Sequence, residues 1–236
     1  MNNMKTGIGM RLFVLLIVLS TAPLFAQQTS MNGSSSNVTK DIEAIVQDME
    51  AGTLSSAEEA GILLMREEEK LARDVYLTLY EKWNIPVFAS IAASETTHMD
   101  SMELLIDRYG LEDPVADESA AARGSYQREE FEELYSDLTA QGLASYQAAL
   151  EVGALIEDLD IADLQKLISE SSNDDVKVVY QNLVKGSRNH LRAFIRQLDR
   201  YDGEYVPQYI TKADYQQIIT SRNESGVITD PDFSFE

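Results

Sequence analysis

The sequence predicts an all-α fold, an up-down four-helix bundle, on three observations. Beyond residue 40, several long stretches repeat apolar residues at intervals of three and four, which is the period of an amphipathic helix. No stretch alternates apolar and polar residues as a half-buried strand would. With 236 residues, 44% of them hydrophobic, the chain can bury one core without disulfides.

The first 39 residues are expected to lie outside the folded domain. Lys5 and Arg11 precede an apolar run at 12–19, so residues 1–26 are interpreted as a secretory signal peptide. The run is much shorter than the roughly 20 apolar residues that cross a bilayer. Residues 27–39, rich in Ser, Asn and Gln, are expected to form a flexible leader. We therefore expect an exported protein, periplasmic or extracellular, that has no membrane partner after cleavage.

The domain, residues 40–219, begins with a predicted helical hairpin. Residues 55–82 carry an apolar stripe that ends where Trp-Asn-Ile-Pro at 83–86 breaks the period. Residues 87–109 carry a second stripe, and the following Gly110 suits a helix end that needs positive φ. The short turn makes the two helices antiparallel.

A long connection leads to a second predicted hairpin. Residues 111–142 contain one short helix, at 129–140, and can cross the length of the bundle. Helices are then predicted at 144–169 and 174–200. Two hairpins joined by one long crossover is the ferritin-like arrangement of a four-helix bundle. The tyrosine-rich segment that follows should pack back on the bundle, and residues 220–236 are expected to form a loose tail.

Composition narrows the classes of function. The chain has 19 Lys and Arg against 40 Asp and Glu, a formal charge of −21, which repels nucleic acid and attracts cations. Nucleic acid is therefore not an expected partner. The absence of cysteine excludes disulfides, thiol catalysis, iron–sulfur clusters and thiolate zinc sites. Any metal site must use histidines and carboxylates.

Each long helix carries acids or a histidine at the centre of its apolar stripe. Burying such groups without compensation would cost several kcal/mol each, more than a domain with about 5 to 15 kcal/mol of net stability can bear repeatedly. A pair of divalent cations would supply positive charge to a cage of carboxylates and imidazoles. In chain order the groups are Glu68, then Glu95 and His98, then Glu157 and Asp160, and finally His190.

These residues match most of the ligand template of ferritin-like di-iron and di-manganese proteins, in which two helices each give one Glu and two each give Glu-x-x-His. The last helix departs from it, because Ser187 stands three residues before His190. Asp160 could replace the missing carboxylate and complete a site for two ions; without it the site would hold one. Glu69 remains an alternative to Glu68 on the first helix.

Four motifs also carry a resemblance to a known family. They are Glu-Glu-Glu-Lys-Leu-Ala-Arg-Asp-Val-Tyr at 67–76, Ile-Ala-Ala-Ser-Glu at 91–95, Gly-Ala-Leu-Ile-Glu at 153–157 and Gly-Ser-Arg-Asn-His-Leu-Arg-Ala-Phe at 186–194. With them the chain resembles, from Met65 to about Ile219, an exported bacterial family, domain of unknown function 2202, of the ferritin-like superfamily. The resemblance implies the bundle and metal ligands but no substrate.

Two less specific interpretations stay open. Arg73, Arg188 and Lys70 could neutralise the acids in a buried salt-bridge network, with the histidines as ordinary core residues. The run Glu67–Glu69 is expected to be mostly a solvated helix face with one member turned inward. If such a network takes the place of a metal, the protein would be a non-catalytic interaction or stress module that kept the bundle and lost the metal chemistry.

We therefore expect an exported ferritin-like protein that binds metal ions and oxidises iron(II) or handles peroxide. Iron or manganese suits a ligand set without thiolates. The oligomeric state is left open, a homodimer included. The expected metal ligands are Glu68, Glu95, His98, Glu157, Asp160 and His190.

Overall fold

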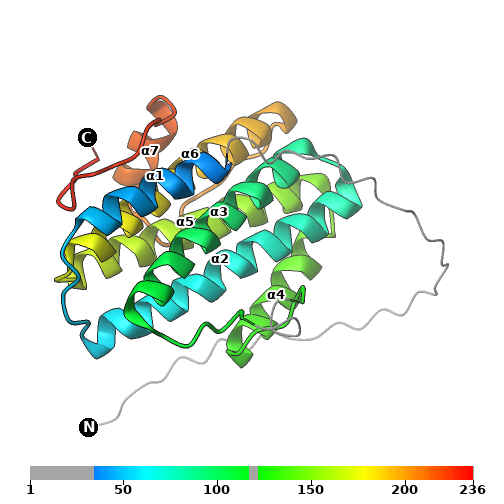
Figure 1. The fold of residues 1–236 in the computed structure, drawn as a ribbon. Helices are drawn as coiled ribbons and strands as arrows, with labels where there is room; N and C mark the ends of the chain where they lie inside the picture. Colours follow the sequence, from blue (N-terminus) through cyan, green and yellow to red (C-terminus); the bar gives the residue numbers. More distant parts are fainter. Residues whose placement is uncertain (1–34, 117–121, 236) are drawn as a thin grey trace, which may run out of the picture. The chain divides into compact units, whose positions relative to one another are not determined.

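The computed structural model describes residues 35–116 and 122–235, and this part of the chain is all-helical, as predicted. Within it lie seven α-helices, one short 3₁₀ helix and no strand (Figure 1). None of these helices combines the length and apolar character needed to cross a membrane. The predicted signal peptide lies outside the described residues. The helices are α1 (Ser35–Asp48), α2 (Ser56–Trp83), α3 (Pro86–Tyr109), α4 (Glu129–Gly142), α5 (Tyr146–Glu170), α6 (Asp174–Leu198), η1 (Asp199–Tyr201) and α7 (Lys212–Thr220).

The four long helices form two antiparallel pairs, α2 with α3 and α5 with α6. Two residues separate α2 from α3 and three separate α5 from α6, so the chain reverses sharply within each pair. The pairs pack face to face, because α2 also contacts α5 and α3 also contacts α6 (Figure 1). Between them lies an aromatic group of Tyr76, Phe88 and Phe194, with ring centroids 5.3 to 6.1 Å apart.

Local caps set the limits of these helices. At the start of α2, the Ser55 hydroxyl accepts the N–H of Glu58 at 3.2 Å and the Glu58 carboxylate accepts the N–H of Ser55 at 2.9 Å. Pro86 occupies the first turn of α3, and Gly110, with φ of 65°, ends it. Ser145 caps α5. Because such signals are local in sequence, the observed limits fall within two residues of the predicted ones.

The crossover from α3 to α5 is anchored on α2. Lys70 is fully buried, and its Nζ donates to Asp74 at 2.7 Å and to the backbone carbonyls of Ala122 and Ser125 at 2.8 and 3.0 Å. Within the crossover, α4 packs against both α2 and α5. The charge of Lys70 therefore holds the crossover and does not serve the interior between the four long helices.

The helix α1 extends into the segment expected to be a flexible leader. The sequence predicts a flexible leader at residues 27–39, whereas α1 begins at Ser35. Ile42 and Val46 of α1 are buried, and the helix packs against α3 and α6. Tertiary contacts stabilise α1, and a leader sequence rich in Ser and Asn does not reveal such contacts.

The C-terminal segment packs along α6, although the sequence predicts a loose tail from residue 220. Asn182 of α6 exchanges two hydrogen bonds with the backbone of this segment, at 2.8 and 2.9 Å. Glu224 forms an ion pair with the buried Arg188 at 2.5 Å. We call residues 221–235 the C-terminal strap. The difference arises because the strap is held by polar contacts with α6 and not by an apolar pattern of its own.

Candidate metal centre

Three predicted residues meet in the interior between α3 and α6. The possible ligand atoms of Glu95, His98 and His190 all lie within 4.8 Å of one another, and all three residues are buried. Nδ1 of His98 is 2.8 Å from one oxygen of Glu95, and Nδ1 of His190 is 3.0 Å from the other. The imidazole rings stack with centroids 5.3 Å apart. The Glu95 carboxylate therefore lies between two imidazoles.

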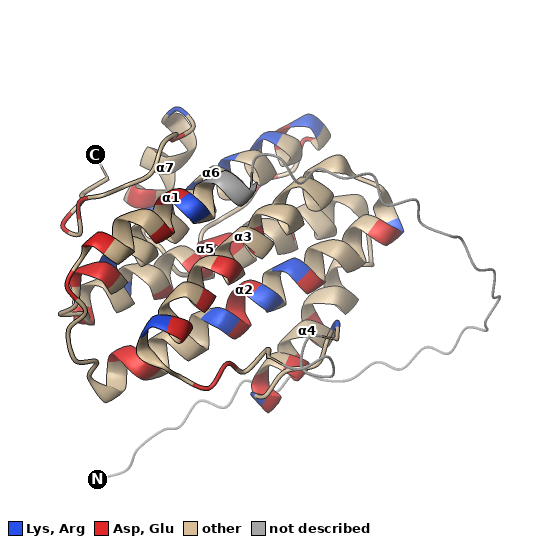
Figure 2. Ribbon diagram, viewed as in Figure 1, with Lys and Arg blue, Asp and Glu red and all other residues tan. Residues whose placement is uncertain are grey.

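The other two long helices each add a carboxylate. Glu69 of α2 lies 3.1 Å from Nδ1 of His98, and Glu157 of α5 lies 3.4 Å from Nδ1 of His190. Each histidine is therefore flanked by two carboxylates, and Glu95 is common to both. We call Glu69, Glu95, His98, Glu157 and His190 the central cluster. Acidic positions occur on all four long helices (Figure 2).

Two predicted ligands lie beside the central cluster and not within it. Asp160 is buried and accepts a hydrogen bond from Ser187, the residue that stands where the template has a second bridging Glu. Glu68 is buried on α2. Among the described residues, neither Glu68 nor Asp160 forms an ion pair with His98 or His190. Glu69 holds the place that the sequence assigned first to Glu68.

The run Glu67–Glu69 is not a solvated face, so that expectation was wrong. The three residues are only 2%, 5% and 2% exposed. Glu67 accepts the backbone N–H of Gln127 at 2.6 Å and pairs with Arg128 at 3.1 Å, both in the crossover. The crossover covers one side of α2 and α3 covers the other, so consecutive glutamates are buried in different surroundings.

Neighbouring residues position the cluster, and the sequence alone did not single out Ser94 or Gly186 for this role. The Tyr76 hydroxyl donates to Glu157 at 2.6 Å. Ser94 Oγ lies 2.8 Å from Nε2 of His190. A Cβ at Gly186 would lie 2.3 Å from Nε2 of His98, so only glycine leaves room for that ring. A glycine inside a helix costs about 1 kcal/mol relative to alanine, and this penalty is the one signal that pointed to a close approach.

Burial and close opposite charges perturb the pKa values of the cluster. Burial raises the pKa of Glu69 to about 7 although His98 opposes it, and burial raises that of Glu157 to about 7 against the opposing effect of His190. Burial disfavours the imidazolium of His190, but Glu95 and Glu157 outweigh it and raise the pKa to about 10. The pKa of Glu95 is lowered, because the two imidazoles outweigh its burial. The cluster thus favours keeping positive charge next to Glu95.

Comparisons with known proteins place the chain in a family. Residues 58–222 match the family described as uncharacterized protein domain DUF2202. The chain belongs to the DUF2202 family. It is 53% identical over 174 residues to "Uncharacterized protein MJ0754" of Methanocaldococcus jannaschii, which covers 74% of this chain and 92% of that protein. The crystal structure of hypothetical protein MJ0754 matches with a TM-score of 0.73 and 51% identity, over 75% of this chain and 99% of that one.

The DUF2202 region contains the whole central cluster. It also contains α2 from its third residue and all of α3 to α7, whereas α1 and nearly all of the C-terminal strap lie outside the matched residues 58–222. The motif residues of the resemblance therefore belong to the part of the chain in which the cluster lies.

The donor atoms of the DUF2202 protein fit a metal ion. Oε1 of Glu69 and Oδ1 of Asp160 are buried without a hydrogen-bond partner, and Oε1 of Glu95 and Nδ1 of His190 lie 3.0 Å apart but form no hydrogen bond of good geometry. Buried polar atoms are normally paired, so the two carboxylate oxygens without a partner leave lone pairs that a cation could accept. Carboxylate oxygens and imidazole nitrogens are ligands that iron and manganese accept.

The cations proposed for a salt-bridge network bind elsewhere. Lys70 and Arg73 both pair with Asp74, at 2.7 and 2.9 Å, and Arg188 pairs with Glu224. Among the described residues, no Lys or Arg forms an ion pair with an acid of the central cluster. The negative charge of the cluster is therefore compensated by the histidines alone.

Proposed function

We propose that this DUF2202 protein is an exported metal-binding protein with a ferritin-like four-helix bundle, which holds iron or manganese and oxidises iron(II) or handles peroxide. The observation that supports it best is the central cluster: three carboxylates and two imidazoles from four helices, buried with unpartnered atoms and without Lys or Arg. Two antiparallel helix pairs joined by a long crossover agree with the ferritin-like arrangement.

In this proposal the ligands divide between two ions that share Glu95. His98 and Glu69 would hold one ion, and His190 and Glu157 the other. Asp160, bound by Ser187, is the further carboxylate that could approach. A bound iron or manganese ion would supply the electron-transfer chemistry that these side chains lack.

The chain's own residues would orient the ligands and exclude water. The hydrogen bonds from Tyr76 to Glu157 and between Ser94 and His190 fix two ligand side chains. The rings of Tyr76, Phe88 and Phe194 pack against one another, and the Tyr76 hydroxyl contacts Glu157. Removal of such a contact typically lowers metal affinity by about 10- to 100-fold.

Metal content is the first test. The protein should be purified without a histidine tag and analysed for transition metals, and its melting temperature should be measured with manganese(II) and, without oxygen, with iron(II). We expect bound metal and a melting temperature that rises with metal concentration, because only the folded state holds the site. Less than about a tenth of an equivalent, with no thermal shift, would contradict the proposal.

Matched variants test the ligands. Glu157→Gln should lose manganese(II) binding, whereas Glu151→Gln on the same helix, whose carboxylate accepts a hydrogen bond from Gln147 and not from the cluster, should retain it. The double variant His98→Ala and His190→Ala should bind no metal and still fold. If the double variant instead unfolds and the wild type binds no metal, the alternative of a non-catalytic helical module is supported. That alternative has one specific observation in its favour: both imidazoles already have carboxylate partners without a metal.

Iron oxidation separates turnover from storage. Iron(II) mixed with metal-free protein in air should oxidise faster than it does with the Glu157→Gln variant. Binding of iron(II) without such an increase would leave a metal-storage protein and remove the oxidase part of the proposal.

A further inference from the structure

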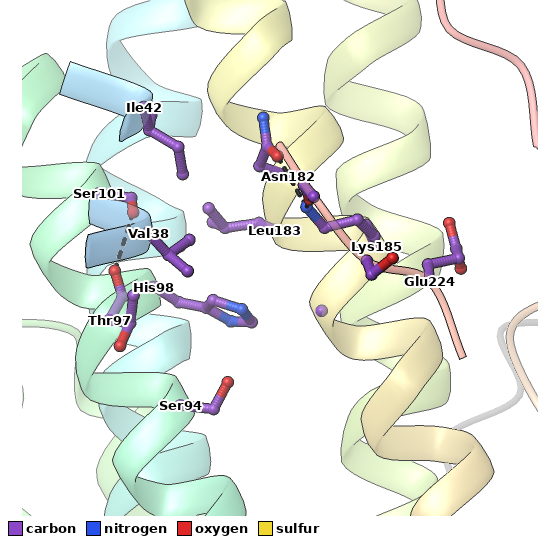
Figure 3. A pocket seen from close by; sticks show the side chains of 13 residues that line it. Val38, Ile42, Ser94, Thr97, His98, Ser101, Asn182, Leu183, Lys185 and Glu224 are labelled. Atoms are coloured by element: carbon purple, nitrogen blue, oxygen red, sulfur yellow. Dashed lines mark hydrogen bonds between the residues drawn. The ribbon is translucent and has the colours of Figure 1, made fainter. Parts of the chain in front are cut away.

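A cavity of about 270 Å³ lies on the outer side of the central cluster, where α1, α3, α6 and the C-terminal strap meet (Figure 3). His98 and Ser94 both line it. The cavity therefore contacts the imidazole of His98 directly and is connected to His190 only through Ser94. The metal site described above does not explain this space.

One lysine and one glutamate line the cavity. Lys185 is the one cation in its lining; its Nζ donates to the side chain of Asn182 at 2.9 Å and to the carbonyl of Gly226. No carboxylate pairs with Lys185 among the described residues. The one acid in the lining, Glu224, which Figure 3 labels, forms ion pairs with the guanidinium groups of Arg188 and Arg192. In a chain of formal charge −21, this is an unusual place for an unpaired ammonium.

Hydrogen-bond donors face the same space. Ser94 and Thr97 line the cavity on the α3 side, and the Ser94 hydroxyl is the one that points toward it, because the Thr97 hydroxyl donates to the carbonyl of Ala93. Nδ1 of His98 faces Glu69 and Glu95, so its Nε2 points toward Gly186 and the cavity. When Nδ1 binds a metal, Nε2 keeps its proton and donates outward. This last step alone rests on the proposed function.

The other part of the cavity is apolar. Val38 and Ile42 of α1 and Leu183 of α6 form it, and Figure 3 shows them grouped above His98. A multiply charged oxyanion such as phosphate would place negative charge next to these apolar side chains, where no group could compensate it. A ligand with one negative charge and a small apolar part matches both the polar side of the cavity at Lys185 and its apolar side.

We infer that this cavity binds a short-chain monocarboxylate, with its carboxylate toward Lys185 and the Ser94 hydroxyl and its carbon chain toward Val38, Ile42 and Leu183. Lys185 supplies the charge-assisted hydrogen bond, and Ser94 and His98 connect the ligand to the histidines of the metal centre. The site is thus a place where a small organic anion can act on the centre without displacing its carboxylates.

Calorimetric titration with sodium butyrate tests the inference on the full chain, first metal-free and then with manganese(II). Butyrate should bind to the metal-free protein with a dissociation constant on the order of millimolar, as expected for a small ligand with one strong contact. Lys185→Met should weaken it by about tenfold or more, and Lys185→Arg should restore most of it. The matched control is Lys177→Met, because Lys177 lies on the same helix, is half-buried and pairs with Asp174.

The outcomes separate this inference from the metal proposal. Butyrate binding that depends on Lys185 in metal-free protein supports the cavity even if manganese(II) never binds. Absence of butyrate binding in a protein that does bind manganese(II) overturns only the cavity. Phosphate binding as tightly as butyrate, or displacement of butyrate by butanol, also overturns the assignment. Because the phosphate and butanol comparisons use wild-type protein, they decide even if Lys185→Met does not fold.

Discussion

Gly186→Ala should disturb the central cluster more than any surface change of the same size. The new Cβ would lie 2.3 Å from Nε2 and 2.6 Å from Cε1 of His98, whereas ordinary contacts are 3.4 to 4 Å. The ring must therefore move by about 1 Å. It cannot do so freely, because its Nδ1 lies 3.1 Å from Glu69 and 2.8 Å from Glu95. The substitution thus forces a choice between a clash and the loss of at least one of these contacts.

The magnitude follows from three contributions. Overpacking a well-filled interior costs about 1 to 3 kcal/mol. Loss of one hydrogen bond to a charged group costs about 1.5 to 3 kcal/mol. Replacing glycine by alanine inside a helix returns about 1 kcal/mol. We therefore expect Gly186→Ala to lower the free energy of unfolding of the metal-free protein by about 1.5 to 5 kcal/mol and to weaken manganese(II) binding.

Urea unfolding and a manganese(II) titration measure the two effects. The matched control is Gly61→Ala in the interior of α2, where the Cβ would meet the flexible end of Leu167 at 2.6 Å, far along the helix from the cluster. That variant should lose less stability, because a half-buried leucine can move aside, and should bind manganese(II) as the wild type does. If Gly186→Ala matches the wild type in both measurements, the reasoning about the packing of His98 is refuted.

Three further predictions concern pH and polar anchors. The melting temperature of the metal-free protein should fall from about pH 5 to about pH 9. The pKa values of Glu69 and Glu157 are raised in the folded state, so ionising these groups above pH 4.5 lowers the free energy of unfolding. The pKa of His190 is raised too, so the stabilisation from its positive charge is lost as pH rises from 6.5 toward 10. A rising melting temperature over that range would contradict this, and manganese(II) should reduce the fall because metal binding displaces protons. Asp158→Asn should cost about 1 to 3 kcal/mol in urea unfolding, since this buried carboxylate accepts three backbone N–H groups of the segment after η1; an unchanged midpoint would count against it. Glu224→Gln should lower the free energy of unfolding by about 2 to 4 kcal/mol, because two buried guanidinium groups lose their negatively charged partner. An unchanged melting temperature at neutral pH would contradict this.

The long helices were predictable because their signals are local. A capping serine at Ser55, the proline at Pro86 and the glycine at Gly110 each mark a limit that the chain obeys. The helix α1 and the strap were not predictable in the same way. Ile42 and Val46 are too few to make a stripe, and Glu224 becomes structural only because α6 brings two arginines to it.

The candidate site was predictable in part for the same reason. Helical spacing indicates that Glu95 and His98 share a face, and the structure brings both to His190. It does not decide between Glu68 and Glu69, since one residue turns the side chain by about 100° and both directions are covered in the fold. Which of two adjacent buried glutamates reaches a histidine depends on how α2 and α3 pack, which no single helix encodes.

The position of the C-terminal strap has a genetic consequence. Residues 221–235 follow every residue of the central cluster in the chain, yet they hold Arg188 through Glu224 and through the ring of Phe235, 4.3 Å away. A stop codon that removed only these last residues would leave all five cluster residues encoded. The shortened product would still expose two guanidinium groups of α6 and lose a wall of the adjacent cavity, so such late nonsense alleles should be far more damaging than their length suggests.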